Sequence, residues 1–403
     1  MRKTLSQNTI TTVKATVPAL ESHGLEIVRT MYGHMFQNPE IRALFNQSHH
    51  GDTGSQPRAL TAAILAYAGN IDNLDALAPA VERIAQKHAG LQILPEHYPY
   101  VGEALLAAIK EVLGDAATDE VMAAWGEAYW FLADILIARE AKIYQELESA
   151  EGGWSGWRPF TVEEIRPEST IITSFILRPK DRGPVIRHKP GQYLTFWLDL
   201  PGSAPLKRNY SISSAPNGES YRISVKRESH GIVSNWLHDH ANIGTELRVA
   251  PPAGEFFLPQ KPARPLVLLS GGVGLTPMMS MLETIAQQRS DVRAHYVHGA
   301  LNGSVHAMGA RVRALSEDTE NIRVTTFYET PRNTDILGRD YDRAGRIDGD
   351  WLRAETPIAE AEYFVCGPKS FLRTLVSDLS LSGVPANRIH YEFFGPADEL
   401  LAA

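Results

Sequence analysis

The segment Ser270-Gly-Gly-Val-Gly-Leu-Thr-Pro277 decides how the C-terminal part of this chain folds. It follows the apolar run Leu266-Val-Leu-Leu269, which predicts a buried strand, and it leads into a helical pattern. The glycines let the backbone approach a pyrophosphate, an anion that the N-terminal end of the next helix also favours. We expect Pro277 in the first turn of that helix and Thr276 as its cap. Because Gly272-Val-Gly274 lacks the third glycine of the dinucleotide fingerprint, the segment alone is a weak signal of nucleotide binding.

The sequence around this segment alternates between strands and helices, and the sequence just before it contains short strands. From about residue 262 onward, the alternation predicts a doubly wound parallel sheet with strands at 266–269, 294–297, 323–327, 363–365 and 389–391. From about 157 to 260, short runs between Pro and Gly turns predict an antiparallel β-barrel with strands at 170–177, 192–198 and 221–226.

The N-terminal residues, up to about 148, are instead typical of helices. Apolar residues recur at helical steps in one series of Leu60, Ile64, Tyr67 and Ile71, and in a longer series of Val121, Trp125, Ala128, Leu132, Ile135 and Ile143. The segment Glu151-Gly-Gly-Trp-Ser-Gly-Trp157 then interrupts the pattern, and we interpret it as a linker. We therefore predict three domains: an all-α domain over 1–148, a β-barrel over 154–261 and an α/β domain over 262–403.

Composition and charge exclude several classes of protein. The chain has 403 residues, 43% of them hydrophobic and 21% charged, which is typical of a soluble protein with two to four domains. A net charge of -8 without a Lys/Arg run argues against a nucleic-acid partner. The single cysteine, Cys366, excludes an intramolecular disulfide and fits a reducing cytoplasm. Because we find neither a signal peptide nor an apolar stretch of about 18 residues, we expect a cytoplasmic monomer without a membrane span.

One histidine in the helical part stands out. Leu77, Val81, Ile84 and His88 follow one another at steps of four, three and four, which places them on one face of a helix. An imidazole directed into an apolar core needs a partner there, and a metal is one candidate. The other reading is a core histidine satisfied by a neighbouring side chain, and the pattern alone favours that reading.

Further motifs of the C-terminal half occur in an order that resembles a known family. Arg208-Asn-Tyr-Ser211 lies between the strand with Pro190-Gly-Gln-Tyr193 and the strand with Val225-Lys-Arg227. Cys366-Gly-Pro368 and the tail Tyr391-Glu-Phe-Phe-Gly-Pro396 follow. Together with the glycine segment, these motifs resemble the ferredoxin-reductase superfamily.

This resemblance implies two cofactor sites. A tyrosine ring would pack on the isoalloxazine of FAD and an arginine would meet its pyrophosphate, which implicates Tyr193, Arg208, Asn209, Tyr210 and Ser211. The nicotinamide nucleotide would be held by Gly271, Gly272, Val273, Gly274, Leu275, Thr276, Cys366, Gly367 and Pro368, and the tail residues assigned to cofactor contacts are Phe393, Phe394, Gly395 and Pro396. The alternatives left open are plain strand packing for the two tyrosines and a redox thiol at Cys366.

With its N-terminal half included, the whole chain resembles the flavohemoglobins. The motifs that carry this resemblance are Met31-Tyr-Gly-His-Met-Phe36, Leu44-Phe-Asn46, Gln56 with Leu60, Gln86-Lys-His88, Tyr98 and Ala138-Arg-Glu140. The resemblance implies haem b with His88 as the proximal ligand and with Tyr98 and Glu140 hydrogen-bonded behind it. It also implies that Phe45 packs on the porphyrin, that Tyr32, Gln56 and Leu60 line the distal side, and that Lys87 and Glu392 lie at the haem–flavin junction.

The implied set has its own physical logic. A histidine that donates its second ring proton to a carboxylate gains imidazolate character and pushes electron density onto iron and bound dioxygen. Tyr32 could donate a hydrogen bond where negative charge develops on that oxygen. Without the resemblance, we would interpret Tyr98 as a packing residue, Glu140 as a solvated helix charge and Lys87 as a surface side chain. We interpret His49 and His50 as loop residues and His97 as a surface residue.

The resemblance implies a nitric oxide dioxygenase. NADH would reduce FAD, FAD would pass single electrons to the haem, and nitric oxide and dioxygen would become nitrate. We expect NADH to be preferred over NADPH, because Val297-His-Gly-Ala-Leu-Asn302 offers no arginine or lysine for a 2′-phosphate, although Arg311 and Arg313 could fold back. Two other classes stay open: a reductase for a peroxide, a quinone or a protein, and a lipid-binding or gas-sensing module in which Leu60 and Ile64 admit an acyl chain.

Overall fold

The computed structural model describes residues 4–44, 55–200, 202–288 and 291–395. Its contacts divide the chain into two compact units, one containing Met1–Ser149 and the other containing Ala150–Trp197 and Arg208–Gly395. We call them the helical unit and the reductase unit and describe each by itself. Of the predicted site residues, Phe45 and Pro396 lie outside the described residues, as do His49, His50 and the side chain of Gln56.

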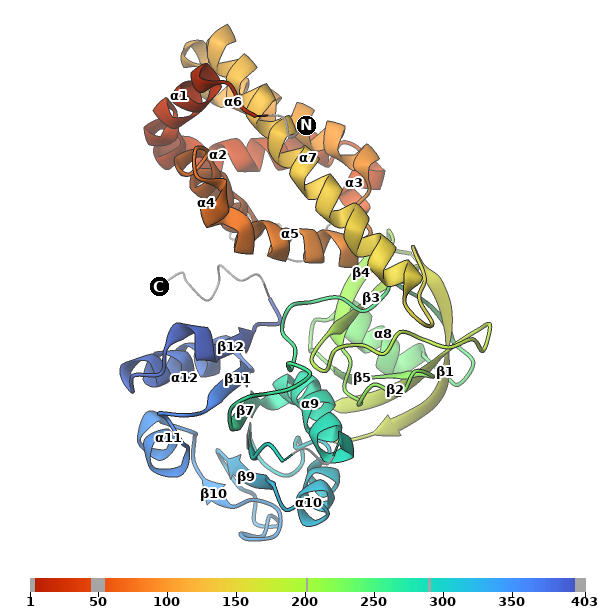
Figure 1. Cartoon of the computed structure of the whole chain (residues 1–403). Helices are drawn as coiled ribbons and strands as arrows, with labels where there is room; N and C mark the ends of the chain where they lie inside the picture. The colour runs from red at the N-terminus through yellow and green to blue at the C-terminus, as the bar shows by residue number, and fades with distance from the viewer. Residues whose placement is uncertain (1–3, 45–54, 201, 289–290, 396–403) are drawn as a thin grey trace. The chain divides into compact units, whose positions relative to one another are not determined.

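The regular structure of the helical unit is helical throughout its described residues (Figure 1). Its helices are α1 Gln7–Ala15, α2 Val17–Met35, α3 Pro39–Ala43, α4 Ser55–Gly69, α5 Ala78–Leu91, α6 Tyr98–Leu113 and α7 Asp119–Ser149, with 3-10 turns η2 Leu74–Leu77, η3 Pro95–His97 and η4 Gly114–Ala116. Side-chain caps begin two of them: Ser6 accepts from the Thr9 amide at 3.0 Å, and Asn38 accepts from the Glu40 amide at 2.9 Å. α5 ends because Gln92 adopts a left-handed backbone with φ of 58°.

The core of the helical unit forms where α2 packs against α4 and α6, and where α5 packs against α7. The predicted helical series lie on α4, α5 and α7, except that Ile71 is buried in the turn after α4 and Leu77 ends the 3-10 turn η2 before α5. By length and composition, α7 is the one helix among the described residues that could cross a membrane. Its residues Trp125, Ala128 and Ile143 belong to the core of this unit, and a buried core helix passes the same test.

The first part of the reductase unit is the expected antiparallel barrel. Its strands are β1 Arg158–Pro167, β2 Ile172–Pro179, β3 Tyr193–Leu198, β4 Leu206–Ser211, β5 Tyr221–Lys226 and β6 Glu246–Val249, with helix α8 Ile232–His240 after β5. They form a sheet in the order β4-β3-β6-β1-β2-β5, and a bridge between Ile212, just after β4, and Ile223 of β5 joins its two edges. Phe160, Phe175 and Phe196 fill the interior.

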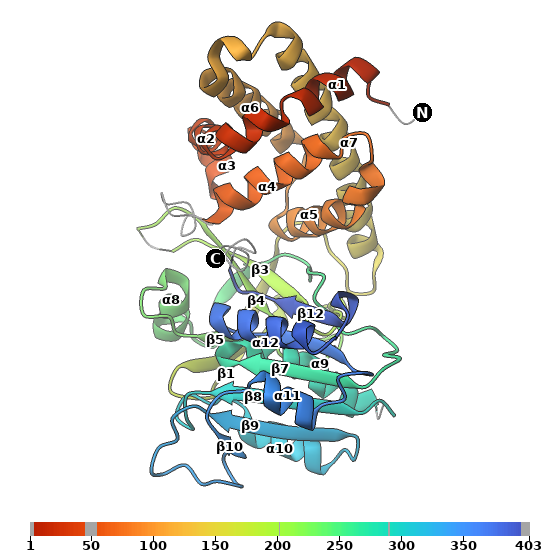
Figure 2. The same cartoon turned by 90° about the vertical axis from the view of Figure 1, so that its left-hand side faces the viewer.

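The second part of the reductase unit is the expected parallel sheet, with helices on both faces (Figure 2). Its strands are β7 Leu266–Gly271, β8 Ala294–Ala300, β9 Ile322–Tyr328, β10 Arg343–Ala344, β11 Glu362–Cys366 and β12 Ile389–Glu392, in the order β10-β9-β8-β7-β11-β12. Its helices are α9 Leu275–Gln288, α10 Gly309–Glu317, α11 Gly349–Glu355 and α12 Lys369–Leu381, with 3-10 turns η5 Gly272–Gly274 and η6 Ala386–Arg388. The strand order reverses between β7 and β11, so the crevice at their carboxyl ends is the place where such sheets bind ligands.

One local expectation needed correction, and several strands had not been predicted. Thr276 is not the cap of α9: it lies inside the helix, and its hydroxyl donates to the Val273 carbonyl at 3.1 Å. The tight turn η5 comes first, so the helix begins at Leu275 and leaves Thr276 past the capping position. The strands β1, β4, β6 and the two-residue β10 were not predicted, because they lack a long apolar alternation.

Candidate functional site

A histidine, a tyrosine and a glutamate converge in the helical unit. His88 lies on α5, Tyr98 begins α6 and Glu140 lies on α7. One oxygen of Glu140, Oε1, lies 2.7 Å from Nδ1 of His88 and 2.6 Å from the Tyr98 hydroxyl, which donates to it. Nδ1 of His88 also lies 3.2 Å from the Tyr98 oxygen. We call these three residues the proximal network.

The proximal network is buried on the glutamate side and open on the histidine side. Glu140 is 2% exposed, so it is not a solvated helix charge, and Tyr98 is 5% exposed. Burial, followed by the hydrogen bond to Glu140, raises the pKa of Tyr98 well above its usual value, so its hydroxyl stays protonated and remains a donor. The His88 side chain is 31% exposed. The ring is therefore anchored through Nδ1 while its other edge stays accessible.

The donor set fits a haem rather than a bare metal ion. Nδ1 of His88 is engaged by Glu140, and no hydrogen bond to Nε2 is seen among the described residues, which leaves Nε2 for a ligand bond. Within the described parts of the chain, no three His, Cys, Asp or Glu side chains come together in a group that could hold a metal. A single imidazole suits an iron whose other ligands come from a porphyrin.

The residues expected on the distal side lie on two helices of the same unit. Tyr32 is buried on α2, where its ring packs against Phe36 with centroids 5.4 Å apart. Leu60 is partly buried on α4 and packs against the same core as Tyr32. Gln56 lies in the first turn of α4.

The neighbouring candidate positions have different surroundings. Lys87 is exposed on α5 next to His88, in agreement with its interpretation as a surface side chain. His97 is partly buried rather than on the surface, because its Nδ1 accepts from the Leu94 amide at 2.9 Å and caps the turn η3. Glu392 ends β12 beside Cys366, its partner on β11.

The residues expected around FAD lie on two strands of the barrel. Arg208 and Tyr210 alternate along β4 and therefore share one face of that strand, both partly exposed. Asn209 faces the other way and is exposed, and Ser211 is buried. The Tyr210 ring meets Phe196 of β3 edge-on, with centroids 5.7 Å apart. A cation and an aromatic ring on one strand face fit the pyrophosphate and the isoalloxazine of a flavin.

Tyr193 is held against a glycine. Its backbone pairs with Ala253 at 3.0 Å in both directions, and a Cβ added to Gly254 would lie 2.9 Å from its ring. Burial, and then the charge of Glu392, raises the pKa of Tyr193 well above its usual value, so the ring is neutral at pH 7. Burial and the same carboxylate also raise the pKa of Cys366. Glu392 therefore acts electrostatically on one residue from each of the two expected cofactor sites.

The glycine loop and the Cys-Gly-Pro loop meet at the carboxyl ends of β7 and β11. A Cβ on Gly274 would lie 2.2 Å from the Cys366 carbonyl oxygen, and a Cβ on Gly271 would lie 3.2 Å from the Pro368 ring. Gly367 approaches Gly271 equally closely, so these glycines allow the two loops to touch. Gly272 is different: its φ is 53° and the space around it is open. A phosphate could approach the backbone there.

The tail and the rest of the glycine loop complete the set of predicted nucleotide contacts. Val273 is partly buried, whereas Leu275 and Thr276 are buried in the first turn of α9. Phe394 is 47% exposed just after β12, and Phe393 and Gly395 are partly buried beside it.

A buried ion cluster, which sequence reasoning missed, joins the barrel to the α/β part. Arg222 on β5 donates to Glu283 on α9 at 2.7 Å, and both side chains are less than a tenth exposed. Arg311 on α10 reaches the same carboxylate from a half-exposed position. Glu283 also accepts from the Ala215 amide at 3.0 Å. Burial by itself raises the pKa of Glu283, but the two arginines outweigh it and hold this pKa below its usual value. The one sign of this ion cluster in the sequence was a charged residue, Glu283, among the apolar residues of α9.

Comparison with known proteins gives a consistent assignment for each part. The family model "Globin" matches residues 29–136, "Oxidoreductase FAD-binding domain" matches 159–258 and "Oxidoreductase NAD-binding domain" matches 268–377. The chain is thus a globin fused to an NAD(P)H oxidoreductase with a flavin domain. A flavohemoprotein of Xylella fastidiosa (strain 9a5c) is 53% identical over 403 residues and is covered completely, as is this chain. One of Rhizobium meliloti (strain 1021) is 47% identical, over 97% of this chain and 98% of its own length.

Solved structures agree. A flavohemoglobin of Malassezia yamatoensis with bound FAD and heme is 26% identical with a TM-score of 0.85, over 98% of this chain and all of that chain. The FAD/NAD-binding domain of a nitric oxide dioxygenase from Vibrio cholerae is 35% identical with a TM-score of 0.54, over 59% of this chain and 99% of that one. This chain belongs to the flavohemoprotein family. The predicted fold class and the predicted cofactors, haem, FAD and a nicotinamide nucleotide, are confirmed.

Proposed function

We propose that this flavohemoprotein is a nitric oxide dioxygenase that uses NADH to convert nitric oxide and dioxygen into nitrate. The observation that carries the proposal is the proximal network. A buried carboxylate on Nδ1 of the proximal histidine gives the ring imidazolate character, and oxygen activation needs the resulting electron push, whereas oxygen storage does not. The name of the 35% identical Vibrio cholerae protein supports the same activity.

The bound cofactors would supply the redox chemistry: FAD splits the hydride pair into single electrons, and the haem iron is the centre at which the two gases react. The protein side chains do the rest. His88 offers Nε2 as the iron ligand. Tyr98 and Glu140 hold its ring in one orientation and one tautomer, with the Nδ1 proton directed at the carboxylate. Phe45, which lies outside the described residues, would pack on the porphyrin.

On the distal side, Tyr32 acts as a hydrogen-bond donor toward the position where negative charge develops during the reaction. Gln56 and Leu60 complete the wall, the first as a polar neighbour and the second as an apolar cover. Lys87 and Glu392 place one positive and one negative charge near the electron-transfer partners and tune their potentials.

In the reductase unit, the two cofactor sites have separate tasks. Arg208 binds the FAD pyrophosphate, and Tyr193 and Tyr210 pack on its ring, with Asn209 and Ser211 fixing the strand that carries them. The nucleotide diphosphate binds at the open backbone of Gly272, and the nicotinamide lies beside Cys366, whose small side chain leaves room for it. The residues that shape this loop pair are Gly271, Val273, Gly274, Leu275, Thr276, Gly367 and Pro368, and the tail Phe393, Phe394, Gly395 and Pro396 covers the flavin.

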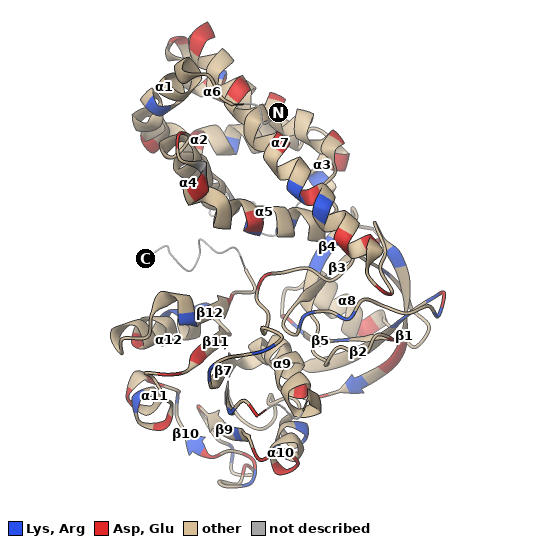
Figure 3. Cartoon of the chain, in the orientation of Figure 1, with Lys and Arg blue, Asp and Glu red and all other residues tan. Residues whose placement is uncertain are grey.

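We further propose the domain limits 1–148, 154–261 and 262–403, a monomeric state, a cytoplasmic location and the absence of a nucleic-acid partner. In Figure 3, Lys and Arg are interspersed with Asp and Glu along the described elements of both units, an arrangement that gives no continuous basic stripe there. This distribution and the net charge of -8 support the absence of a nucleic-acid partner.

The deciding experiment measures products. The full-length protein with both cofactors is mixed with NADH, nitric oxide and dioxygen, and nitrate and NADH are quantified. Each nitrate takes up one electron, so two nitrates per NADH are expected, and none without dioxygen. NADH oxidation that yields peroxide, or that needs a quinone or a protein acceptor, would instead support the general reductase.

A pair of matched variants tests the role of the distal tyrosine. Tyr32→Phe should slow nitrate formation while leaving flavin reduction by NADH unchanged. Tyr67→Phe is the control, because it removes another buried tyrosine hydroxyl of the helical unit, one that donates to the Ala128 carbonyl at 2.8 Å. Equal rates in the two variants would remove Tyr32 from the reaction.

A further inference from the structure

Helix α9 of the reductase unit is held to the barrel by hydrogen bonds on two consecutive helical turns. On one turn, the Ser280 hydroxyl donates to the Ser214 carbonyl at 2.7 Å. On the next turn, Glu283 accepts from the Ala215 amide at 3.0 Å through Oε2 and from Arg222 of β5 at 2.7 Å through Oε1. Two successive residues of the barrel are thus bound by one face of the helix.

Further polar groups take part in the same contact. Arg222 also donates to the Ser213 carbonyl. Nε2 of His188 lies 3.0 Å from the Ser214 carbonyl and 3.1 Å from the Ser280 hydroxyl. His188 is buried, and burial lowers its pKa to about 4, so its ring is neutral at pH 7. Side chains from β5, from α9 and from the loop before β3 therefore all hold the 213–215 segment, which follows β4.

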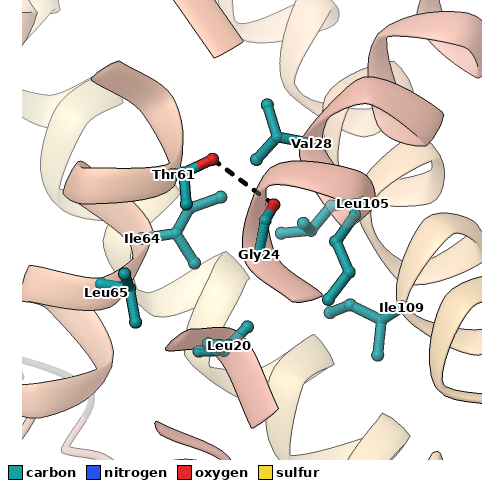
Figure 4. A pocket seen from close by; sticks show the side chains of 9 residues that line it. Leu20, Gly24, Val28, Thr61, Ile64, Leu65, Leu105 and Ile109 are labelled. Atoms are coloured by element: carbon teal, nitrogen blue, oxygen red, sulfur yellow. Dashed lines mark hydrogen bonds between the residues drawn. The ribbon is translucent and has the colours of Figure 1, made fainter. Parts of the chain in front are cut away.

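Apolar packing alone would not fix α9 so closely against the barrel. One apolar contact is made by Met281, whose terminal methyl would lie 2.6 Å from a Cβ on Gly191, and a methionine side chain adapts its shape readily. Aliphatic side chains can also leave slack: in the helical unit, Leu20, Ile64 and Leu105 meet around a cavity of about 10 Å³ (Figure 4). Hydrogen bonds have defined lengths and directions. The polar contact is therefore what fixes the position of α9.

The buried charges in this contact need an explanation of their own. The Arg222 and Glu283 side chains are only 7% and 4% exposed, so both have lost most of their hydration. Replacing such a pair by well-packed apolar residues is often neutral or even stabilising. What the ion pair supplies instead is a single permitted arrangement of the elements that carry it. We infer that the cluster serves orientation.

The contact connects the two proposed cofactor sites. The 213–215 segment comes just after β4, the strand with Arg208 and Tyr210. Glu283 lies just over two helical turns after Leu275, where α9 begins directly behind the glycine turn η5. Because backbone hydrogen bonds join each turn of a helix to the next, a displacement at Glu283 moves the glycine turn as well. The cluster thus sets the glycine turn relative to the flavin strand.

We propose that Glu283, together with Ser280, is a positioning residue for hydride transfer, which fixes α9 so that the nicotinamide of NADH lies at reacting distance from the flavin. This rests on the cofactor sites of the proposed function, but not on nitric oxide as the substrate. In the step, one hydrogen leaves the nicotinamide with both electrons of its bond, so the nicotinamide is oxidised and the flavin reduced. No proton passes through the cluster. The reacting atoms must come within about 3–3.5 Å, and a displacement of about 1 Å costs roughly a hundredfold in rate.

The first test measures flavin reduction by NADH in the anaerobic full-length holoprotein, at a temperature at which every variant is folded. In Glu283→Gln, the limiting rate should fall by roughly ten- to a hundredfold, while FAD stays bound and the Kd for NADH changes by less than about threefold. The charge-transfer absorbance between reduced flavin and NAD⁺, which requires overlap of the two rings, should weaken.

Glu355→Gln is the matched control for this test. Glu355 is likewise held by two arginines, Arg323 at 2.6 Å and Arg343 at 3.3 Å, but all three lie within the α/β part of the unit. This variant makes the same chemical change without touching the barrel. It should keep the wild-type limiting rate and the wild-type charge-transfer absorbance.

The second test, hydrogen exchange, does not depend on activity. Exchange at the Ala215 amide, which donates to Glu283, should be faster in Glu283→Gln than in the wild-type holoprotein. Ser280→Ala removes one hydrogen bond of the contact and keeps the carboxylate. It should speed the same exchange and lower the limiting rate by a smaller factor, and it provides a readout even if Glu283→Gln fails to fold. Ser174→Ala is its control, because it removes a buried serine hydrogen bond, to Ser224 at 2.8 Å, inside the barrel.

Several outcomes would overturn the positioning role. They are a wild-type limiting rate in both Glu283→Gln and Ser280→Ala, an equal loss in Glu355→Gln, a loss confined to the Kd for NADH, and slower reduction with an unchanged charge-transfer absorbance. None of these readouts uses nitric oxide or dioxygen. A protein that shows the expected effects but forms no nitrate would therefore refute the dioxygenase activity alone.

Discussion

Replacing Glu140 with Gln tests the proximal network most directly, because the change removes a charge and keeps the shape. In the wild-type protein, one carboxylate oxygen lies 2.7 Å from Nδ1 of His88 and accepts from the Tyr98 hydroxyl at 2.6 Å. A hydrogen bond to a charged group contributes about 1.5–3 kcal/mol, and one between neutral groups about 0.5–1.5 kcal/mol. Two hydrogen bonds that each become weaker by roughly 1 kcal/mol lower the stability of the folded protein by about 2 kcal/mol. The lower cost of burying a neutral amide instead of a charge offsets part of this loss.

Two assays report this loss. In the five-coordinate ferrous protein, the iron–histidine stretch measured by resonance Raman should move to lower frequency, because the amide withdraws less of the Nδ1 proton. The thermal transition of the helical unit, followed at the Soret band, should fall by about 4–8 °C. The haem content should stay close to that of the wild-type protein, since the Nε2 edge of His88 is not altered.

Glu82→Gln is the matched control. Glu82 accepts two hydrogen bonds, at 2.7 Å and 2.9 Å, from Arg139, the residue that precedes Glu140. The Glu82 side chain is 37% exposed. Such a pair contributes at most about 1 kcal/mol, and it does not touch His88. An iron–histidine frequency that is unchanged in Glu140→Gln, or shifted equally in both variants, would refute the electron-push argument and leave Glu140 a structural residue.

Four further predictions follow from the same geometry. His88→Ala should abolish haem retention or ferrous oxygen binding while flavin reduction by NADH stays near the wild-type rate, and a normal five-coordinate ferrous spectrum would disprove the ligand assignment. NADH should exceed NADPH in kcat/KM by roughly tenfold or more, because Arg311 is engaged by Glu283; a value for NADPH that is equal or higher would refute this preference. Gly274→Ala, whose Cβ would meet the Cys366 carbonyl at 2.2 Å, should slow hydride transfer with FAD retained. Gly383→Ala is the control, because Gly383 has a φ of 85° with open space around it and the change adds only about 1 kcal/mol of backbone strain; similar losses in both variants would argue against loop contact as the cause. Glu283→Gln should destabilise the reductase unit by about 3 kcal/mol at neutral pH. Because the folded state lowers the pKa of this carboxyl, its contribution to stability is complete above the usual pKa of 4.5 and is lost as the pH falls through the lowered pKa. The unfolding free energies of wild type and variant should therefore converge at acid pH, and a constant difference between them would contradict this sign.

The sequence predicted the elements whose periodicity is strong. Val81, Ile84 and His88 of the predicted stripe lie on α5, after Leu77 at the end of η2, and the apolar run at 266–269 lies in the central strand β7 of the parallel sheet. These succeeded because a buried helix face or a fully buried strand leaves a regular apolar pattern. β1 was missed, since its burial alternates irregularly around a register shift between Val162 and Glu164.

The candidate site was predictable only where a motif is local. The glycine loop is contiguous, so its place after a strand could be read directly. The proximal network joins residues 10, 42 and 52 positions apart, and no periodicity connects them; a family resemblance supplied that set. Arg222 and Glu283, 61 positions apart, belong to no motif, and a buried ion pair leaves no pattern in the sequence. The prediction of Thr276 as a helix cap was wrong because the 3-10 turn η5 precedes α9 and places the start of that helix at Leu275.

The burial of Cys366 makes this chain convenient for site-specific labelling. Cys366 is the one cysteine of the sequence, it is fully buried at the end of β11, and its raised pKa keeps little of it as the reactive thiolate. A cysteine introduced at an exposed position, such as Tyr100 or Ile243, would therefore be the one that a maleimide dye modifies. Two such positions, one in each unit, can carry a donor and an acceptor dye, and energy transfer between the dyes then reports the distance between the units while NADH is being consumed.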